Sequence, residues 1–140
     1  MSNLDTALNI AIEAHKNQVD KAGHKYISHP FRLSTKMDTE EEKIVALLHD
    51  VLEDSDVTEE YLVEQGFSDN VITALVLLTK TKKQDYFNDY IKKIKTNKLA
   101  TRIKIADLID NINLSRLSIV SVKDISRTRK YLDALEYLIN

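Results

Sequence analysis

The sequence predicts an all-α protein, a single-domain helical bundle of about eight helices that spans residues 1–140. Only two glycines and one proline occur among the 140 residues, so little in the chain can separate short β-strands from one another. Sustained alternation of polar and apolar residues is absent, whereas apolar residues recur at helical spacing over most of the chain. A length of 140 residues suits one domain with a real core.

Two helices and a polar loop are expected at the N-terminus. Residues 3–19 carry apolar residues at helical spacing, and Ser2 is placed to cap this helix. A polar loop follows, and Pro30 suits the first turn of a short second helix. Because proline holds the residue before it in extended backbone, His29 is expected to flank that helix rather than to lie within it.

Capping residues mark the next two helices. Thr39 and Glu42 form a capping box in front of an apolar helix that runs to about Asp54. Thr58 can begin a shorter helix that ends at Gly66, because glycine accepts the left-handed backbone of a helix C-cap.

The C-terminal half is expected to be helical as well. Residues 68–80 are apolar nearly all round, as in a central helix of a bundle, and a basic, polar break separates them from the amphipathic segment 85–95. Ser121 and Asp124 cap the last helix. The expected core faces are Ile105, Leu108, Ile109 and Ile112 within residues 97–116, and Ile125, Leu132, Leu135 and Leu138 or Ile139 in the last helix.

The composition excludes several classes of protein. Apolar residues make up 43% of the chain and charged residues 30%, which is typical of a soluble globular protein. With 20 basic and 22 acidic residues there is no broad basic field, so a nucleic-acid polymer is not an expected partner, although a small anion needs only a local cluster. The absence of cysteine excludes disulfides and thiolate metal sites and favours the cytoplasm. The strongest apolar run, residues 71–78, is too short to span a membrane. The sequence does not indicate an oligomeric state.

A cluster of ionisable residues interrupts the apolar helix in the stretch ALLHDVLEDSD. His49 and Asp50 stand inside the apolar run, and Glu53 and Asp54 follow one turn later on the same helical face. Burying such groups is costly unless something satisfies them. Taken alone, His49 could be a hydrogen-bonded core histidine, and the acidic residues could be a solvated helix end, although carboxylates there oppose the helix dipole.

The other interpretation is a metal site that includes residues from distant segments. His29 stands at a helix entrance, and Asp107 and Asn111 lie one turn apart on a later helix. Imidazole and carboxylate ligands suit a divalent first-row ion such as manganese, iron or zinc. Such an ion lowers the pKa of a water molecule, and Glu53 or Asp54 would be placed to orient that water or to accept its proton.

Three stretches of the sequence resemble the HD-domain phosphohydrolases. They are AHKNQVDKAGHKYISHP, ALLHDVLEDSDVTEEYL and RIKIADLIDNI, in the order of that family and at roughly its spacing. Within the family, the chain is most similar to the guanosine 3′,5′-bis(diphosphate) 3′-pyrophosphohydrolase branch, which contains the hydrolase domains of alarmone synthetase/hydrolases and the small alarmone hydrolases.

The resemblance implies a role for ten residues. It implies one bound divalent ion, manganese first, with iron, cobalt, zinc or nickel as alternatives. The implied metal ligands are His29, His49, Asp50 and Asp107; the implied catalytic pair that positions and activates water is Glu53 and Asp54; and the implied substrate-binding residues are Lys21, Asn111, Lys82 and Arg127. A solvated basic loop is the simpler interpretation of Lys82.

The predicted function is hydrolysis of the 3′-pyrophosphate of (p)ppGpp to GDP or GTP and pyrophosphate. Two alternatives stay open. Val19 and Asp20 replace basic residues that the family often carries before Lys21, and Asp110 replaces a histidine, so the substrate could be another nucleotide or a 3′-phosphorylated cofactor. A non-catalytic helical module that binds a nucleotide or a protein is the second alternative.

Overall fold

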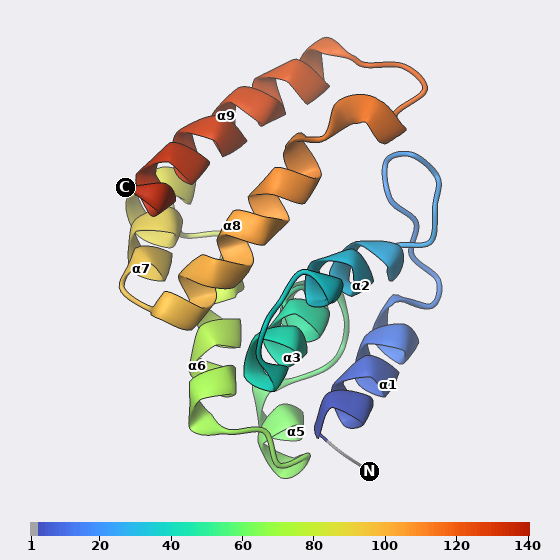
Figure 1. Cartoon of the computed structure of the whole chain (residues 1–140), viewed down its shortest axis with the longest axis vertical. Coiled ribbons are helices and arrows are strands. Elements are labelled where there is room, and N and C mark those ends of the chain that lie inside the picture. The colour runs from blue at the N-terminus through green and yellow to red at the C-terminus, as the bar shows by residue number, and fades with distance from the viewer. Residues whose placement is uncertain (1–2) are drawn as a thin grey trace.

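The computed structural model describes residues 3–140 and consists of helices joined by short loops (Figure 1). Among these residues no β-strand occurs, and strand-like pairing is limited to an isolated bridge between Val19 and Lys25. The predicted all-α fold class is therefore confirmed. No helix in the described part of the chain has both the length and the apolar character needed to cross a membrane.

The helices differ widely in length, and two short segments are not α-helical. The π-helical turn is η1 and the 3-10 turn is η2. In chain order the elements are α1 (Asn3–His15), α2 (Ser28–Thr35), α3 (Glu40–Leu48), α4 (Val51–Asp54), α5 (Glu59–Glu64), α6 (Asp69–Leu78), η1 (Tyr86–Ile91), α7 (Lys92–Lys95), α8 (Lys98–Ile112), η2 (Leu114–Arg116) and α9 (Val122–Ile139).

Helices α3 and α8 lie at the centre of the packing. Helix α3 contacts α1, α2, α6 and α8, and its residues from Ile44 to Leu48 are all buried. Helix α8 contacts α2, α3, α6, α7 and α9 (Figure 1). The buried apolar side chains of these helices belong to one hydrophobic core. Since the predicted ligands His49 and Asp107 are on or beside these two helices, the core itself brings them together.

Most predicted helix ends are confirmed. The Thr39 hydroxyl accepts from the Glu42 N–H and the Glu42 side chain accepts from the Thr39 N–H, which is the expected capping box. Thr58 caps α5, and Gly66 after that helix has a left-handed φ of +90°. Ser121 and Asp124 form the capping box of α9. The expected capping residue Ser2 lies outside the described residues.

Three helix boundaries differ from the prediction. Helix α1 ends at His15 rather than at residue 19, because the Gln18 N–H closes a turn on the His15 carbonyl. His29 is inside the first turn of α2 rather than flanking it, since the backbone turn before Ser28 already fixes its conformation. The helix expected from Thr39 to Asp54 is interrupted after Leu48, and α4 begins at Val51.

The interruption falls on the His49–Asp50 pair. His49 Nδ1 donates to the Ala46 carbonyl at 2.6 Å. An uninterrupted helix would offer that carbonyl to the Asp50 N–H, so the imidazole competes for it. The expectation that Glu53 and Asp54 follow His49 and Asp50 on one face of a continuous helix therefore does not apply, because the helix is interrupted at the first of these pairs.

Two predicted core faces were only partly correct. In α8, Leu108 is buried but Ile109 is 49% exposed, and the buried face includes Lys104 and Asp107. In α9, Leu138 is buried, whereas Ile125, Leu132 and Ile139 are exposed. Helix α9 covers α8 from outside, so only one side of it can meet the core (Figure 1).

Candidate metal and catalytic centre

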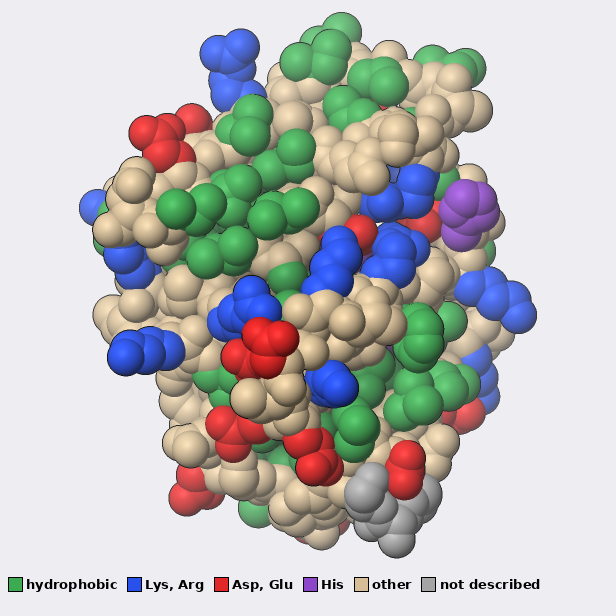
Figure 2. Space-filling view, viewed as in Figure 1, with side chains coloured by type: hydrophobic (Ala, Val, Ile, Leu, Met, Phe, Trp, Pro, Cys, Tyr) green, Lys and Arg blue, Asp and Glu red, His purple; other side chains and the backbone are tan. Residues whose placement is uncertain are grey.

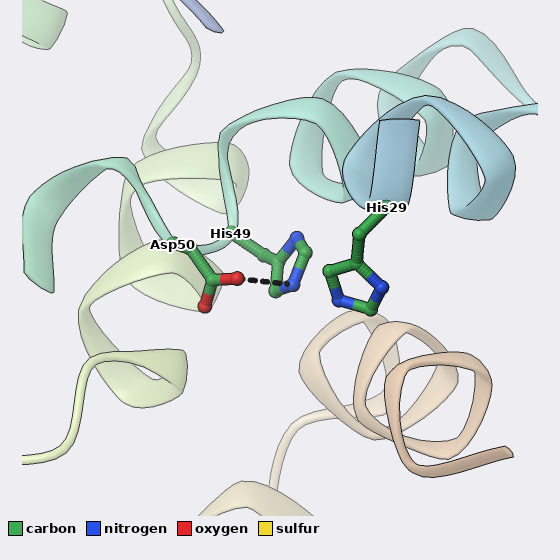
Figure 3. Close-up of side chains that lie close together, drawn as sticks. All are labelled: His29, His49 and Asp50. Carbon is green, nitrogen blue, oxygen red and sulfur yellow. Dashed lines mark ion pairs between the residues drawn. The ribbon is translucent and has the colours of Figure 1, made fainter. Parts of the chain in front are cut away.

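Four of the predicted site residues meet between α2, α8 and the junction of α3 and α4. Potential ligand atoms of His29, His49 and Asp50 all lie within 4.8 Å of one another (Figure 3). Asp107 approaches both imidazoles, with its Oδ1 2.8 Å from His29 Nε2 and 3.5 Å from His49 Nε2. The structure thus brings His29, His49 and Asp50 together, with Asp107 beside the two imidazoles.

The orientation of His49 fits a cation at this point. Because Nδ1 donates to the Ala46 carbonyl, Nε2 is the nitrogen left for a ligand. This Nε2 is buried, has no hydrogen-bond partner among the described residues, and lies 3.0 Å from Asp50 Oδ2. Burial alone would lower the pKa of His49, but the Asp50 and Asp107 carboxylates outweigh it and raise that pKa well above its ordinary value. Either a proton or a metal ion meets this demand for positive charge.

His29 is held between two carboxylates of α8. Its Nε2 pairs with Asp107 at 2.8 Å, and its Nδ1 pairs with Asp110 Oδ2 at 2.6 Å. Burial alone would lower the pKa of His29, but these two hydrogen bonds raise it. A cation bound at Nε2 would replace one ring proton, while Asp110 would keep the Nδ1 proton in place.

Asp110 was not among the predicted site residues. Its carboxylate is buried and accepts from Arg32 Nε at 3.1 Å and Arg32 Nη2 at 2.9 Å, while its backbone carbonyl accepts from Arg116. Burial alone would raise the pKa of Asp110, but the hydrogen bonds and charges of His29 and Arg32 hold it well below its ordinary range. The sequence signal for this role was a carboxylate three residues after Asp107 on the same helix face.

Lys104 is a second charged residue of the cluster that sequence reasoning missed. It is buried, and its Nζ lies 2.9 Å from Asp107 Oδ2 and 5.2 Å from the centroid of the Tyr90 ring. Burial alone would raise the pKa of Asp107, but Lys104 and the two imidazoles hold it well below the ordinary value. Asn111 donates to Asp107 Oδ1 at 2.9 Å, so the predicted substrate-binding amide also orients this carboxylate.

Asp50 and the acidic pair differ in their electrostatics. The Tyr26 hydroxyl donates to Asp50 Oδ2, and the His49 charge, opposed by burial, lowers the pKa of Asp50 to about 2. Burial and the neighbouring charges of Asp50 and Glu53 raise the pKa of Asp54 to about 6. Glu53 Oε1 accepts from the Lys80 backbone N–H at 2.9 Å, which fixes its position.

A cavity of about 500 Å³ opens over this cluster. Its lining includes the carboxylates of Asp50, Glu53, Asp54 and Asp107 and aromatic side chains from η1 and α9. Of the predicted substrate residues, Lys21, Asn111 and Arg127 line the cavity and Lys82 does not. Lys80, Lys104 and Arg116 are three further lining cations, and Tyr26, Tyr86, Tyr90 and Tyr131 supply the aromatic wall.

The position of Lys82 has a simple local cause. After α6 ends at Leu78, the chain turns, with the Gln84 N–H bonded to the Thr81 carbonyl at 3.2 Å. Lys80 precedes this turn and reaches the cavity, whereas Lys82 lies in the turn. The prediction of Lys82 as a substrate-binding residue therefore receives no support from the cavity, and the solvated loop fits it better.

Known proteins resemble the chain in sequence and in fold. It is 32% identical over 120 residues, 78% of this chain, to a guanosine-3′,5′-bis(diphosphate) 3′-pyrophosphohydrolase of Aquifex aeolicus. It is 30% identical over 137 residues, 91% of this chain, to the enzyme of that name from Haemophilus influenzae. The matched segments make up only 17% and 20% of these two relatives, so the chain spans about a fifth of their length. No family model matches the chain.

A solved structure supports the fold independently. It is described as a metazoan ortholog of SpoT that hydrolyses ppGpp, and it superimposes with a TM-score of 0.81 over 100% of this chain and 86% of the other, at 22% identity. At this identity the match concerns the fold. The predicted resemblance is thus confirmed: the chain has the all-α HD-type fold of a SpoT ortholog and is related in sequence to the guanosine-3′,5′-bis(diphosphate) 3′-pyrophosphohydrolases.

Proposed function

We propose that the chain is a metal-dependent nucleotide phosphohydrolase that removes the 3′-pyrophosphate of (p)ppGpp. The observation that carries this proposal is the buried Nε2 of His49, which faces Asp50 and Asp107 beside His29. These two aspartates also line a cavity that has cationic side chains in its lining. The names of the sequence relatives supply the substrate. We place this activity in the cytoplasm, the location that the sequence predicts for the chain.

His29, His49, Asp50 and Asp107 would hold one divalent ion, with manganese the first candidate. The donor set fits such an ion because it combines imidazole nitrogens with carboxylates, and cysteine is absent from the sequence. When bound, a divalent ion supplies Lewis-acid activation of water and neutralises charge on a phosphate. Asp110 and Lys104 would support the site by orienting His29 and Asp107.

The acidic pair would control the attacking water. A carboxylate with a pKa of about 6 is ionised at neutral pH and still basic enough to accept a proton, which suits Asp54 as a general base. Glu53 is held by the hydrogen bond from the Lys80 backbone N–H and would orient the water. The cations Lys21, Lys80 and Arg127 on the cavity lining would offset phosphate charge.

The loop before Lys21 keeps a second substrate class open. Val19 and Asp20 both line the cavity, and neither adds positive charge there. Asp20 has a structural role, since its Oδ1 accepts from the Ala22 and His24 N–H groups at 2.9 Å. Val19 is 66% exposed and has no comparable role, so a less highly charged nucleotide or a 3′-phosphorylated cofactor is the second candidate.

A nucleotide panel tests the proposal directly. Purified protein with added Mn²⁺ is expected to release pyrophosphate from ppGpp faster than from any other nucleotide, and to lose this activity with a chelator. His49→Ala is expected to abolish turnover, while His24→Ala, a matched change at an exposed histidine that does not line the cavity, should leave it intact. Preferential turnover of another nucleotide would replace the substrate, and no turnover with full Mn²⁺ occupancy would favour a non-catalytic binding module.

A further inference from the structure

The outer face of α9 is more apolar than a surface helix requires. Ile125, Leu132 and Ile139 are 55%, 49% and 62% exposed, although their spacing predicts a buried face. Ile109 of α8 is also exposed. Figure 2 shows hydrophobic side chains gathered over the region where α9 and α8 run in Figure 1. A contiguous apolar surface of this kind marks an interaction site more often than scattered exposed residues do.

The spacing of these residues is that of a helix-pairing seam. Ile125, Leu132 and Ile139 are seven residues apart, so they lie along one line of the helix with a drift of about 20° at each step. The seam is roughly 21 Å long, from the 1.5 Å rise of each residue. Ala134, which packs into the core, lies on the opposite side of α9. The apolar seam is therefore on a different face of α9 from the one that packs against the rest of the domain.

The order of residues along the seam favours a second copy of this chain as its occupant. Isoleucines stand seven residues before and seven residues after Leu132. A two-fold axis at Leu132 would place Leu132 on its own equivalent and Ile125 of one copy on Ile139 of the other. An antiparallel pair of α9 helices thus matches every apolar seam residue with another one.

Charges beside the seam favour the same arrangement. Arg129 and Glu136 are exposed and flank the seam on one side, and neither forms an ion pair within the described part of the chain. The same two-fold axis places Arg129 of one copy opposite position 135 of the other copy, next to Glu136. Because of the symmetry, this Arg129–Glu136 contact occurs twice in the dimer. In a parallel pair the two-fold axis runs along the helices, so Arg129 and Glu136 would each face the other flank of the partner helix and would not pair with one another.

We propose that α9 mediates an antiparallel two-fold dimer of this chain, with Ile125, Leu132 and Ile139 as its apolar seam and with Arg129–Glu136 ion pairs between the copies. The proposal does not rest on the proposed hydrolase activity. A single helix pair with its flanking residues is a small interface, so the dissociation constant is expected in the micromolar range.

Sedimentation equilibrium over a concentration series measures this association. The unmodified chain is expected to pass from monomer to dimer as its concentration rises, and Leu132→Asp is expected to weaken association about 100-fold, because it places two carboxylates at the centre of the seam. Val63→Asp is the matched control, since Val63 is an equally exposed apolar residue, at 55%, on the distant helix α5. It should leave association unchanged, and thermal unfolding of both variants checks that they remain folded.

Charge exchange tests the direction of the helices. Arg129→Glu alone and Glu136→Arg alone are each expected to weaken the dimer roughly 10-fold, since each creates like charges at both symmetric contacts. The double exchange should restore association to within about 3-fold of the unmodified chain. A chain that stays monomeric up to about 1 mM, where a micromolar dimer would be fully formed, would overturn the proposal and leave another protein as the occupant. A dimer that survives Leu132→Asp, or a folded double exchange that is not restored, would also overturn it.

Discussion

Replacing Asp110 by asparagine tests how His29 is prepared for a metal ion. The Asp110 carboxylate accepts from His29 Nδ1 at 2.6 Å and is neutralised by Arg32 at 2.9 Å, so it fixes the imidazole with Nε2 directed toward Asp107. Asparagine keeps the size of the side chain but removes the negative charge. Residues that orient a ligand in this way typically contribute about 10- to 100-fold to metal affinity, which equals roughly 1.4–2.7 kcal/mol.

The measurement is a Mn²⁺ titration of the metal-free protein by calorimetry, with urea unfolding of each variant in parallel. Asp110→Asn is expected to bind Mn²⁺ with a dissociation constant higher by one to two orders of magnitude. The change also removes a charge-assisted hydrogen-bond network and is expected to lower the free energy of unfolding by about 1–3 kcal/mol. Asp38→Asn is the control, because Asp38 also pairs with an arginine, Arg102 at 3.3 Å, but contacts no imidazole.

Two outcomes would be informative in different ways. An unchanged Mn²⁺ affinity of a folded Asp110→Asn variant would refute the role assigned to Asp110 while leaving the metal site in place. A failure of the unmodified chain to bind any divalent ion would instead refute the metal site itself, and His29 would then be a histidine paired with two carboxylates for structural reasons.

Three further predictions concern His49, the aromatic wall and Asp54. His49→Ala is expected to remove stoichiometric Mn²⁺ binding, measured by metal analysis after gel filtration, because it deletes the one buried ring nitrogen without another partner at the cluster. Tyr86→Phe is expected to leave urea stability unchanged or slightly higher, because the Tyr86 hydroxyl is buried without a partner among the described residues. Tyr90→Phe is expected to cost about 1 kcal/mol, because it loses a bond to the Leu78 carbonyl, and equal effects of the two changes would contradict this reading. Since an Asp54 with a pKa of about 6 must lose its proton to act as a base, kcat at saturating Mn²⁺ should rise as the pH passes upward through about 6. Asp54→Asn should abolish that limb of the pH profile, and a limb that persists would exclude Asp54 as its source.

The pKa values of the ligand carboxylates shift in the opposite direction to that of Asp54, and this sets the pH dependence of stability. The folded protein holds the pKa of Asp50 at about 2, below that of an unfolded aspartate at about 3.9. The stabilisation is therefore complete above the unfolded pKa and is lost as the pH falls through the folded one. Asp107 shifts in the same direction. The metal-free protein is thus expected to lose stability progressively below about pH 4, which urea unfolding at a series of pH values can measure.

The site shows how far sequence reasoning reached. The ligand residues could be proposed because the histidines and aspartates stand in the order and spacing of a known family. Their partners could not, since Asp110 is 81 residues from His29 and meets it only because α8 packs against α2. A lysine within the apolar pattern of α8 gave the clearest missed signal, because a buried Lys104 requires a charged partner such as Asp107.

The sequence by itself determined the all-α class and most helix starts, because caps and helical spacing depend on residues within a turn of one another. It also supplied the imidazole and carboxylate residues of the predicted ligand set. Only the tertiary structure decided which face of each helix is buried. It left the Ile125–Leu132–Ile139 line of α9 outside, since α9 packs on one side only, and it interrupted the helix at His49, where the imidazole binds the Ala46 carbonyl. These features depend on contacts between distant elements and on local competition for a backbone acceptor, which periodicity along the chain does not encode.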